Sequence, residues 1–373
     1  PGSVANNYRI SARMSFGGHS YYKMVPPKKY FADHPEYFAL MDGKRTGEGN
    51  HLCSSNKDVR EILVREVRKE FEKGYDVVTL GQEDGYMRCQ CDECEAMDNY
   101  RGWGPRNKTA QGGLDGEGED VESWEDFYDR LRENPCERVL SLHKYVVEEI
   151  KKSHSDKKIN MLVYGPTMYP SKKFKFGDTV IAEVCSADPR AAEAWRDQVF
   201  GLTTYTYLFD PTLPMGLSVH ASPDEVAKMV RTLKKNNYIG LSQLAETNFG
   251  LQGPVYYVLG KLMGDVSLDP DELMKEYCGG VFENAGDTMY EFFKIVYARH
   301  ELWPLNEGHF GKLPADKSWS TSDTFAHLYT PEFIARTDRL LQKAEREADS
   351  ERSKNWLKMT RAHYDFLKLM TEA

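Results

Sequence analysis

The stretch SSNKDVREILVREVRKEFEKGYDVVTLGQEDG, residues 54–85, reads as a helix followed directly by a strand. Apolar residues recur at helical spacing through its first half, which has Ser or Asn available to cap the start and a glycine at the end. Its second half, YDVVTLGQE, is a short apolar run typical of a buried parallel strand, and two adjacent acids follow. The stretch therefore predicts one helix and strand of an α/β protein, with Glu83 and Asp84 at the carboxyl end of the strand.

The same alternation of apolar strand and helix extends over the first two thirds of the chain. We count six strand candidates, at residues 8–16, 75–83, 158–166, 178–186, 201–210 and 238–246. A long helix is expected from about Trp124 to Lys152, after a Gly-rich acidic insertion at about 95–125 that we expect to lie as a loop over the strand ends. From about Gly253 onward the chain reads as helices.

This rhythm predicts an α/β fold of the (β/α)8 TIM-barrel type, followed by a C-terminal helical region. We place the barrel in residues 1–265 and the helical region, packed on the barrel, in residues 266–373. Six strands are two fewer than a closed eightfold barrel needs. Either two strands are hidden in irregular segments, or they lie upstream of this sequence, or the barrel is incomplete or distorted.

Composition excludes several classes of partner. The net charge of −9 opposes binding to a nucleic-acid backbone, and no basic patch outweighs it. No apolar run approaches the roughly 20 residues needed to span a bilayer. The start, PGSVANNYR, lacks the regions of a signal peptide and is typical of a cloning remnant, which leaves an upstream targeting segment or domain open.

Glu83 and Asp84 are the main catalytic candidates. Side chains alternate along a strand, so Val78 and Leu80 should face the helices while Thr79 and Glu83 face the inner side. Gly85 allows a turn, through which both carboxyl groups can reach one site at the strand end, where barrel enzymes keep their chemistry. Two close carboxyl groups raise one another's proton affinity, which suits a general acid beside a charged partner. The alternative is a turn in which Asp84 caps a helix and Glu83 is solvated.

Other polar residues are expected at the same rim. Glu246 ends the strand of residues 238–246 and is a third catalytic candidate. Within the strands, Arg13 and Glu183 are expected to form a buried ion pair. Residues at or near strand ends that could contact a sugar are His19, Tyr164, Tyr205, Tyr207 and Asp210, although core packing is an equally good explanation for the tyrosines.

Three cysteines, Cys89, Cys91 and Cys94, form a C-x-C-x-x-C motif just after the acid pair. They supply three soft ligands for a structural zinc ion, and Cys53 or His51 could supply the fourth. The alternatives are buried thiols, or a disulfide with a distant cysteine. The total of seven cysteines excludes a fully paired disulfide framework.

Four segments together resemble a known family: HPEYFALMDGKR, HLCSSNKDVREIL, QEDGYMRCQCDEC and VYYVLGKLMGDVSLDPDELMKEYCGGVF. In this order they are similar to the domain of unknown function 4838, which includes the bacterial enzymes grouped as glycoside hydrolase family 163. The resemblance runs from about residue 13 to residue 290. It implies a barrel-type glycosidase and, for characterised members, endo-β-N-acetylglucosaminidase activity on complex N-glycans, with no cofactor required for catalysis. It also implies a periplasmic, cell-surface or secreted protein.

The resemblance implies a retaining, substrate-assisted mechanism, in which the 2-acetamido oxygen of the sugar attacks its own anomeric carbon. It assigns Glu83 as general acid/base and Asp84 as the group that orients the acetamide, although the two roles could be exchanged, and Glu246 is held in reserve. Two other functions stay open. One is an α-glucuronidase-like hydrolase of uronic-acid glycans, which needs a basic residue in the cleft, and the other is a carbohydrate-binding barrel without activity.

Overall fold

The computed structural model describes residues 14–47, 49, 51–85, 88–98, 124–185, 189–209, 216–245, 249–302 and 321–372. The chain divides into two compact units. The first comprises Pro1–Tyr205 with Ile239–Leu241, and the second comprises Thr206–Tyr238 with Ser242–Ala373. The predicted insertion at 95–125 falls mostly outside the described residues.

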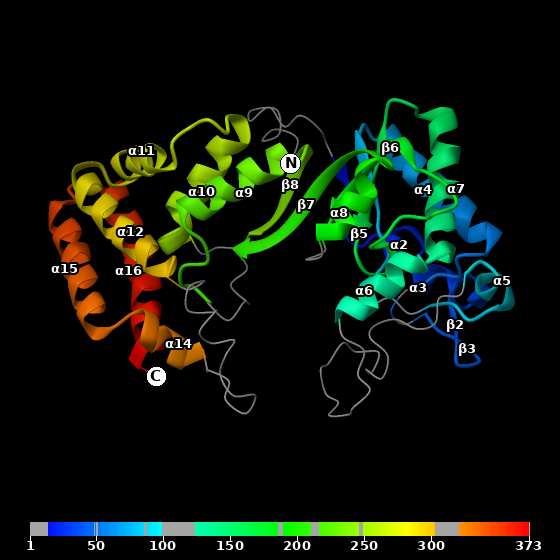
Figure 1. Cartoon of the computed structure of the whole chain (residues 1–373), viewed down its shortest axis with the longest axis horizontal. Coiled ribbons are helices and arrows are strands. Elements are labelled where there is room, and N and C mark those ends of the chain that lie inside the picture. Colours follow the sequence, from blue (N-terminus) through cyan, green and yellow to red (C-terminus); the bar gives the residue numbers. More distant parts are fainter. Residues whose placement is uncertain are drawn as a thin grey trace. The chain divides into compact units, whose positions relative to one another are not determined.

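A six-stranded sheet carries the fold (Figure 1). Its strands follow one another in the order β1-β4-β5-β6-β7-β8, and each neighbouring pair from β1 to β7 is parallel. The strands are β1 (Met14–Ser15), β4 (Val77–Leu80), β5 (Lys158–Val163), β6 (Gly177–Val184), β7 (Val199–Phe209) and β8 (Tyr238–Ala245). All six strands predicted from the sequence are confirmed, and among the described residues their consecutive order is that of an incomplete α/β barrel.

Burial explains why the strands could be predicted. All four residues of β4 are buried, as are five of the six residues of β5. A parallel strand covered on both faces needs a continuous apolar run, and VVTL and INMLV supply it. Polar side chains on one face meet across the sheet, where Asn160 Nδ2 donates to Glu183 Oε2 at 3.0 Å and to Thr79 Oγ1 at 3.4 Å. Arg13, the expected partner of Glu183, lies outside the described residues.

Helix α4 (Lys57–Glu72) forms where the opening stretch predicts it. The Asn56 side chain caps its start by accepting the Val59 N–H at 3.1 Å, and its apolar stripe is buried. The single helix expected at 124–152 is wrong, because the structure has two helices, α6 (Trp124–Glu133) and α7 (Glu137–Ser153). Pro135 separates them, since proline lacks an N–H and restricts the residue before it.

A small hairpin that the sequence analysis missed lies between the first two strands of the sheet. Strands β2 (Leu40–Met41) and β3 (Lys44–Arg45) pair antiparallel through a two-residue turn. Asp42 and Gly43 both have positive φ, 48° and 77°, as a type I′ turn requires. The remaining elements of the first unit are α2 (Tyr21–Met24), α3 (Pro27–Tyr30), η1 (Pro35–Tyr37), α5 (Asp92–Glu95), η3 (Gly165–Thr167) and α8 (Pro189–Arg196).

The second unit is mainly helical, which confirms the predicted C-terminal helical region. Helix α10 (Phe249–Gly264) is apolar on most sides and packs against α9, α11 and α16. The other helices are α9 (Pro223–Lys235), α11 (Pro270–Phe282), η4 (Glu283–Ala285), α12 (Gly286–His300), α14 (Thr321–Leu328), α15 (Pro331–Glu347) and α16 (Glu351–Glu372). Within the described residues, none of these helices has the length and apolar character to cross a bilayer.

Candidate active site at the end of strand β4

The loop that follows β1 is bound to the end of β4. Ser20 N–H donates to the Gly81 carbonyl at 3.0 Å, and Gly81 N–H donates back to Ser20 Oγ at 2.9 Å. A Cβ at Gly81 would lie 2.6 Å from the Gly18 carbonyl oxygen and 2.8 Å from Leu162 Cδ1, so only glycine permits this approach. The two strand ends therefore carry their side chains into one neighbourhood.

Glu83 is buried, with 8% of its surface exposed. Its Oε1 accepts the backbone N–H of Tyr22, in the first turn of α2, at 3.1 Å. Burial raises the pKa of Glu83, and the backbone N–H groups of α2 and the nearby His19 offset only part of this effect. The environment thus favours a protonated carboxyl group at Glu83.

Asp84 has a different environment, although it is the next residue. Its side chain is exposed, and Tyr164 Oη donates to Oδ1 at 2.8 Å. The same oxygen accepts the Gly85 N–H at 3.0 Å, within the turn that the sequence predicted. The two neighbouring acids therefore differ in burial and in hydrogen-bond partners.

His19 and Tyr164 border the acid pair. His19 Nδ1 lies 2.5 Å from the Gln82 carbonyl oxygen, and its ring meets the Tyr164 ring edge-on at a centroid distance of 6.1 Å. These two side chains follow β1 and β5, the two neighbours of β4 in the sheet. The structure therefore brings together four of the predicted site residues, from the carboxyl ends of three adjacent strands.

Gln82 is a supporting residue that the sequence analysis missed. It is fully buried, and its Nε2 donates to the Tyr164 carbonyl at 2.6 Å and to Thr167 Oγ1 at 2.9 Å. These bonds fix the segment that carries the Tyr164 ring beside Asp84. The available signal was its position between Gly81 and Glu83 at the end of a buried strand. An amide there indicates hydrogen-bond partners, because amides are seldom buried without them.

The other predicted residues are not placed against the acid pair. Tyr205 is half-buried in β7, which β5 and β6 separate from β4 in the sheet. The Tyr207 side chain, Asp210 and Glu246 lie outside the described part of the chain.

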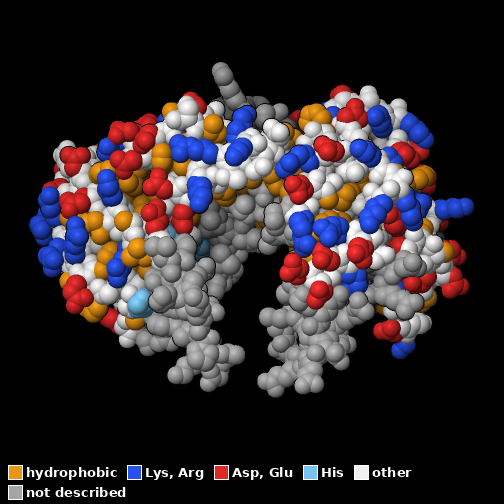
Figure 2. Space-filling model, in the orientation of Figure 1, with side chains coloured by type: hydrophobic (Ala, Val, Ile, Leu, Met, Phe, Trp, Pro, Cys, Tyr) orange, Lys and Arg blue, Asp and Glu red, His pale blue; other side chains and the backbone are white. Residues whose placement is uncertain are grey.

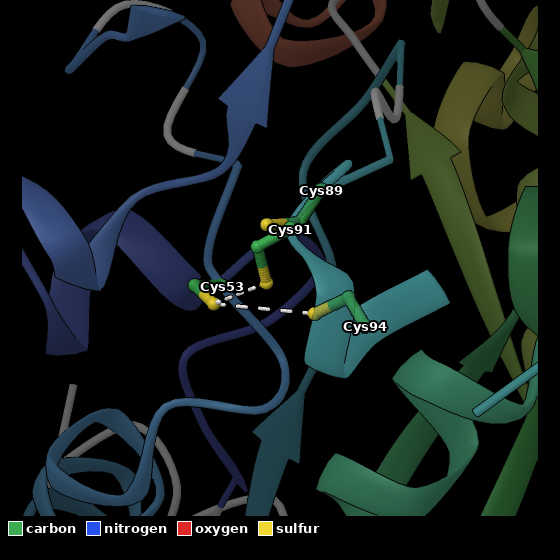
Figure 3. Close-up of side chains that lie close together, drawn as sticks. All are labelled: Cys53, Cys89, Cys91 and Cys94. Atoms are coloured by element: carbon green, nitrogen blue, oxygen red, sulfur yellow. Dashed lines mark hydrogen bonds between the residues drawn. The ribbon is translucent and has the colours of Figure 1, made fainter. Parts of the chain in front are cut away.

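The three cysteines of the C-x-C-x-x-C motif meet a fourth cysteine (Figure 3). Cys53, Cys89, Cys91 and Cys94 are all buried, and their sulfur atoms all lie within 4.8 Å of one another. Cys53 Sγ is 3.7 Å from Cys91 Sγ and 3.9 Å from Cys94 Sγ. All four are free thiols, and of the two candidates for a fourth ligand the structure joins Cys53, not His51, to the group.

A separate basic cavity of about 530 Å³ contains none of the predicted site residues. Its lining comes largely from the connection between β5 and β6, including Lys172, Lys173 and Lys175.

The family model described as "Domain of unknown function (DUF4838)" matches residues 3–294. The chain belongs to the DUF4838 family. The matched region of this DUF4838 chain includes the acid pair, the four cysteines and the whole six-stranded sheet. A comparison with proteins of curated function gives no match.

Among solved structures, the DUF4838 chain is similar to a mutant O-GlcNAc hydrolase from Thermobaculum terrenum. The two share 11% identity with a TM-score of 0.42, and the similarity covers 86% of this chain. The chain spans 65% of the length of that structure.

Proposed function

We propose that this DUF4838 protein is a glycoside hydrolase that cleaves β-N-acetylglucosaminide linkages in complex N-glycans by a retaining, substrate-assisted mechanism. The observation that carries the proposal is the adjacent pair Glu83 and Asp84 at the end of β4, one buried with a raised pKa and the other exposed and hydrogen-bonded. Paired carboxyl groups in contrasting environments are how acid and base roles are divided in such sites. A glycoprotein substrate would be met in the periplasm, at the cell surface or outside the cell.

Glu83 takes the role of general acid/base. Its raised pKa keeps a proton available to the glycosidic oxygen as the bond to the anomeric carbon breaks. In the same step the acetamido oxygen of the sugar bonds to the anomeric carbon, and an oxazolinium ion forms that keeps its N–H proton. Glu83, now a carboxylate, then removes a proton from the water that opens this ring, so the configuration at the anomeric carbon is retained.

Asp84 takes the role of the group that orients the acetamide. The Tyr164 hydroxyl and the Gly85 N–H hold its carboxylate. This carboxylate can accept a hydrogen bond from the acetamide N–H, which increases the negative charge on the attacking acetamide oxygen. The rings of Tyr164 and His19 stand beside this carboxylate and supply apolar surface for a sugar face.

The first experiment compares the wild type with Glu83→Gln and Asp84→Asn on a complex N-glycoprotein, with released glycans measured by mass spectrometry. We expect each variant to lose roughly 10²- to 10⁴-fold in rate, the usual contribution of such groups. Glu137→Gln is the control, because Glu137 is also a buried glutamate but its carboxylate accepts the Ser171 hydroxyl at 2.8 Å.

A second substrate series separates the two roles. Aryl N-acetylglucosaminides with a dinitrophenyl leaving group need little acid assistance, so Glu83→Gln should regain much of its activity on them while Asp84→Asn should not. Fluorination of the acetamide should slow the wild type steeply, because the acetamide oxygen is the nucleophile. The proposal would be contradicted if the wild type cleaved neither the complex N-glycoprotein nor the aryl N-acetylglucosaminides, or if it cleaved only uronides.

A further inference from the structure

We propose that Cys53, Cys89, Cys91 and Cys94 together bind one zinc ion in a closed tetrathiolate site, which fixes the loop that follows the acid pair. The inference goes beyond the proposed hydrolase activity and does not depend on it. Its ligands come from separate parts of the chain: Cys53 precedes α4, Cys89 and Cys91 lie in the loop after β4, and Cys94 lies in α5 (Figure 3).

The spacing of the sulfur atoms fits a tetrahedral zinc ion. A Zn–S bond of about 2.3 Å places the sulfurs of a regular tetrahedron about 3.8 Å apart. The distances from Cys53 Sγ to Cys91 Sγ and Cys94 Sγ are 3.7 and 3.9 Å. A disulfide needs sulfur atoms about 2.05 Å apart, so these contacts are not disulfide bonds. A multinuclear iron–sulfur cluster would hold its cysteines farther apart than the 4.8 Å limit within which all four sulfur atoms lie.

The surroundings suit a doubly negative zinc tetrathiolate. Leu40 N–H points to Cys89 Sγ at 3.3 Å, and Ser55 Oγ lies 3.2 Å from Cys53 Sγ and 3.3 Å from Cys94 Sγ. The Arg45 guanidinium interacts with the Cys53 sulfur and lies near enough to Cys89 and Cys91 to act on them electrostatically. Donors and a cation around the sulfurs orient the ligands and balance their charge, as the outer shell of a metal site does.

Apolar cover closes the site. Ala39 and the four cysteines form one buried cluster, with Leu40 and Met41 of the β2–β3 hairpin packed against it. Four protein ligands without an open position are typical of a structural zinc, not a catalytic one. In an oxidising compartment, four free thiols this close would be expected to form disulfides, whereas metal-bound thiolates are protected by their bonds to the ion.

The segment that carries Cys89 and Cys91 is also held by two hydrogen bonds from other parts of the chain. Gln90 N–H donates to the Leu40 carbonyl at 2.7 Å, and the buried Arg138 guanidinium donates to the Cys89 carbonyl. Cys89 follows Asp84 by five positions. A zinc ion at the cysteines therefore restrains the segment that leaves the acid pair.

The test measures metal in the full chain after expression with added zinc. Inductively coupled plasma mass spectrometry should find one zinc per chain in the wild type and a loss of bound zinc in Cys53→Ser and Cys94→Ser. Cys278→Ser is the matched control, because Cys278 is a fully buried thiol of α11 outside the cluster, and it should keep the zinc.

A second measurement on the wild type guards against serine variants that fail to fold. Cobalt(II) in place of zinc should give the thiolate charge-transfer absorption and strong d–d bands of a tetrahedral tetrathiolate, and titration with an organic mercurial should release one metal ion per four thiols modified. Zinc-free protein after refolding in zinc, stoichiometric iron, or a disulfide within the cluster found by peptide mapping would each overturn the inference.

Discussion

At the scale of single residues, adjacent side chains of one turn meet opposite environments. Glu83 turns back toward the N-terminal N–H groups of α2 and is buried, whereas Asp84 reaches outward to the Tyr164 hydroxyl. This difference follows from the alternation of side chains along an extended chain, which points neighbouring residues to opposite sides. The alternative in which Asp84 caps a helix is not what the structure shows, since it is Glu83 that accepts a helix N–H.

Glu83 should make the stability of the fold depend on pH in a definite direction. Its folded-state pKa is raised, so the folded chain holds this proton more tightly than the unfolded chain, and stability falls as pH rises from the ordinary glutamate value through the raised one. The glutamine side chain in Glu83→Gln does not titrate, so this variant lacks that loss of stability. Urea unfolding from pH 4 to pH 8 should therefore show the wild type losing stability relative to Glu83→Gln as pH increases, and equal slopes would contradict the burial argument.

Gly81 should not tolerate a side chain. In Gly81→Ala the new Cβ would press on the Gly18 carbonyl oxygen at 2.6 Å, which is backbone and cannot move away cheaply. We expect a loss of about 1–3 kcal/mol in the free energy of unfolding. Gly260→Ala is the control, because Gly260 lies in α10 with nothing within 4 Å of its added Cβ, and there alanine should be neutral or stabilising.

At the scale of elements, a buried ion pair joins helix α7 to the segment that follows the cysteines and α5. The Arg138 side chain is 0% exposed, and its Nη2 lies 2.6 Å from Oδ1 of Asp98, itself 3% exposed. Arg138 also bonds to the Cys89 carbonyl, so one side chain serves both the helix and the loop. Charges buried this deeply are tolerated because each has a partner.

Removing one partner of this pair should therefore be costly. We expect Arg138→Met to lower the free energy of unfolding by about 3–5 kcal/mol, because it leaves Asp98 buried without its cation. The double variant Arg138→Met with Asp98→Asn should recover part of the loss. Denaturant unfolding of the two single variants and the double variant measures the coupling, and strictly additive losses would show that the pair does not act as a unit.

At the scale of the whole molecule, surface charge is mixed. Figure 2 shows Lys and Arg side chains interspersed with Asp and Glu over the visible described face of each unit.

Acid should destabilise the molecule partly through one buried histidine. His143 is fully buried, its Nε2 lies 2.7 Å from Tyr21 Oη, and burial lowers its pKa to about 3. Below the ordinary histidine value the unfolded chain binds a proton that the folded chain refuses, so stability falls as pH drops, by about 1.4 kcal/mol per unit for this group. His143→Gln should flatten the slope between pH 6.5 and pH 4 in thermal or urea unfolding, unlike the exposed control His34→Gln.

The sequence predicts those parts of the structure that depend on neighbouring residues. Buried strands such as VVTL are recognisable as apolar runs. Asp42-Gly43 and Pro135 are equally local signals, for the hairpin and for the break between α6 and α7, but the sequence analysis did not use them. The bond from Tyr22 N–H to Glu83 joins residues 61 positions apart. Which residue would complete the cysteine group likewise depended on tertiary packing, and the candidates His51 and Cys53, two positions apart, could not be separated beforehand.

The positions of the four cysteines also bear on the order of events during synthesis. All of them lie between residues 53 and 94, ahead of β5, which begins at Lys158. These thiols leave the ribosome before most of the sheet has been made. A metal ion captured at that stage would close loops of 38 and 41 positions in the nascent chain, so the entropy cost of ordering the segment around β4 would be met before β5 is made. Metal supply would then govern how fast the chain folds, as well as how stable it is once folded.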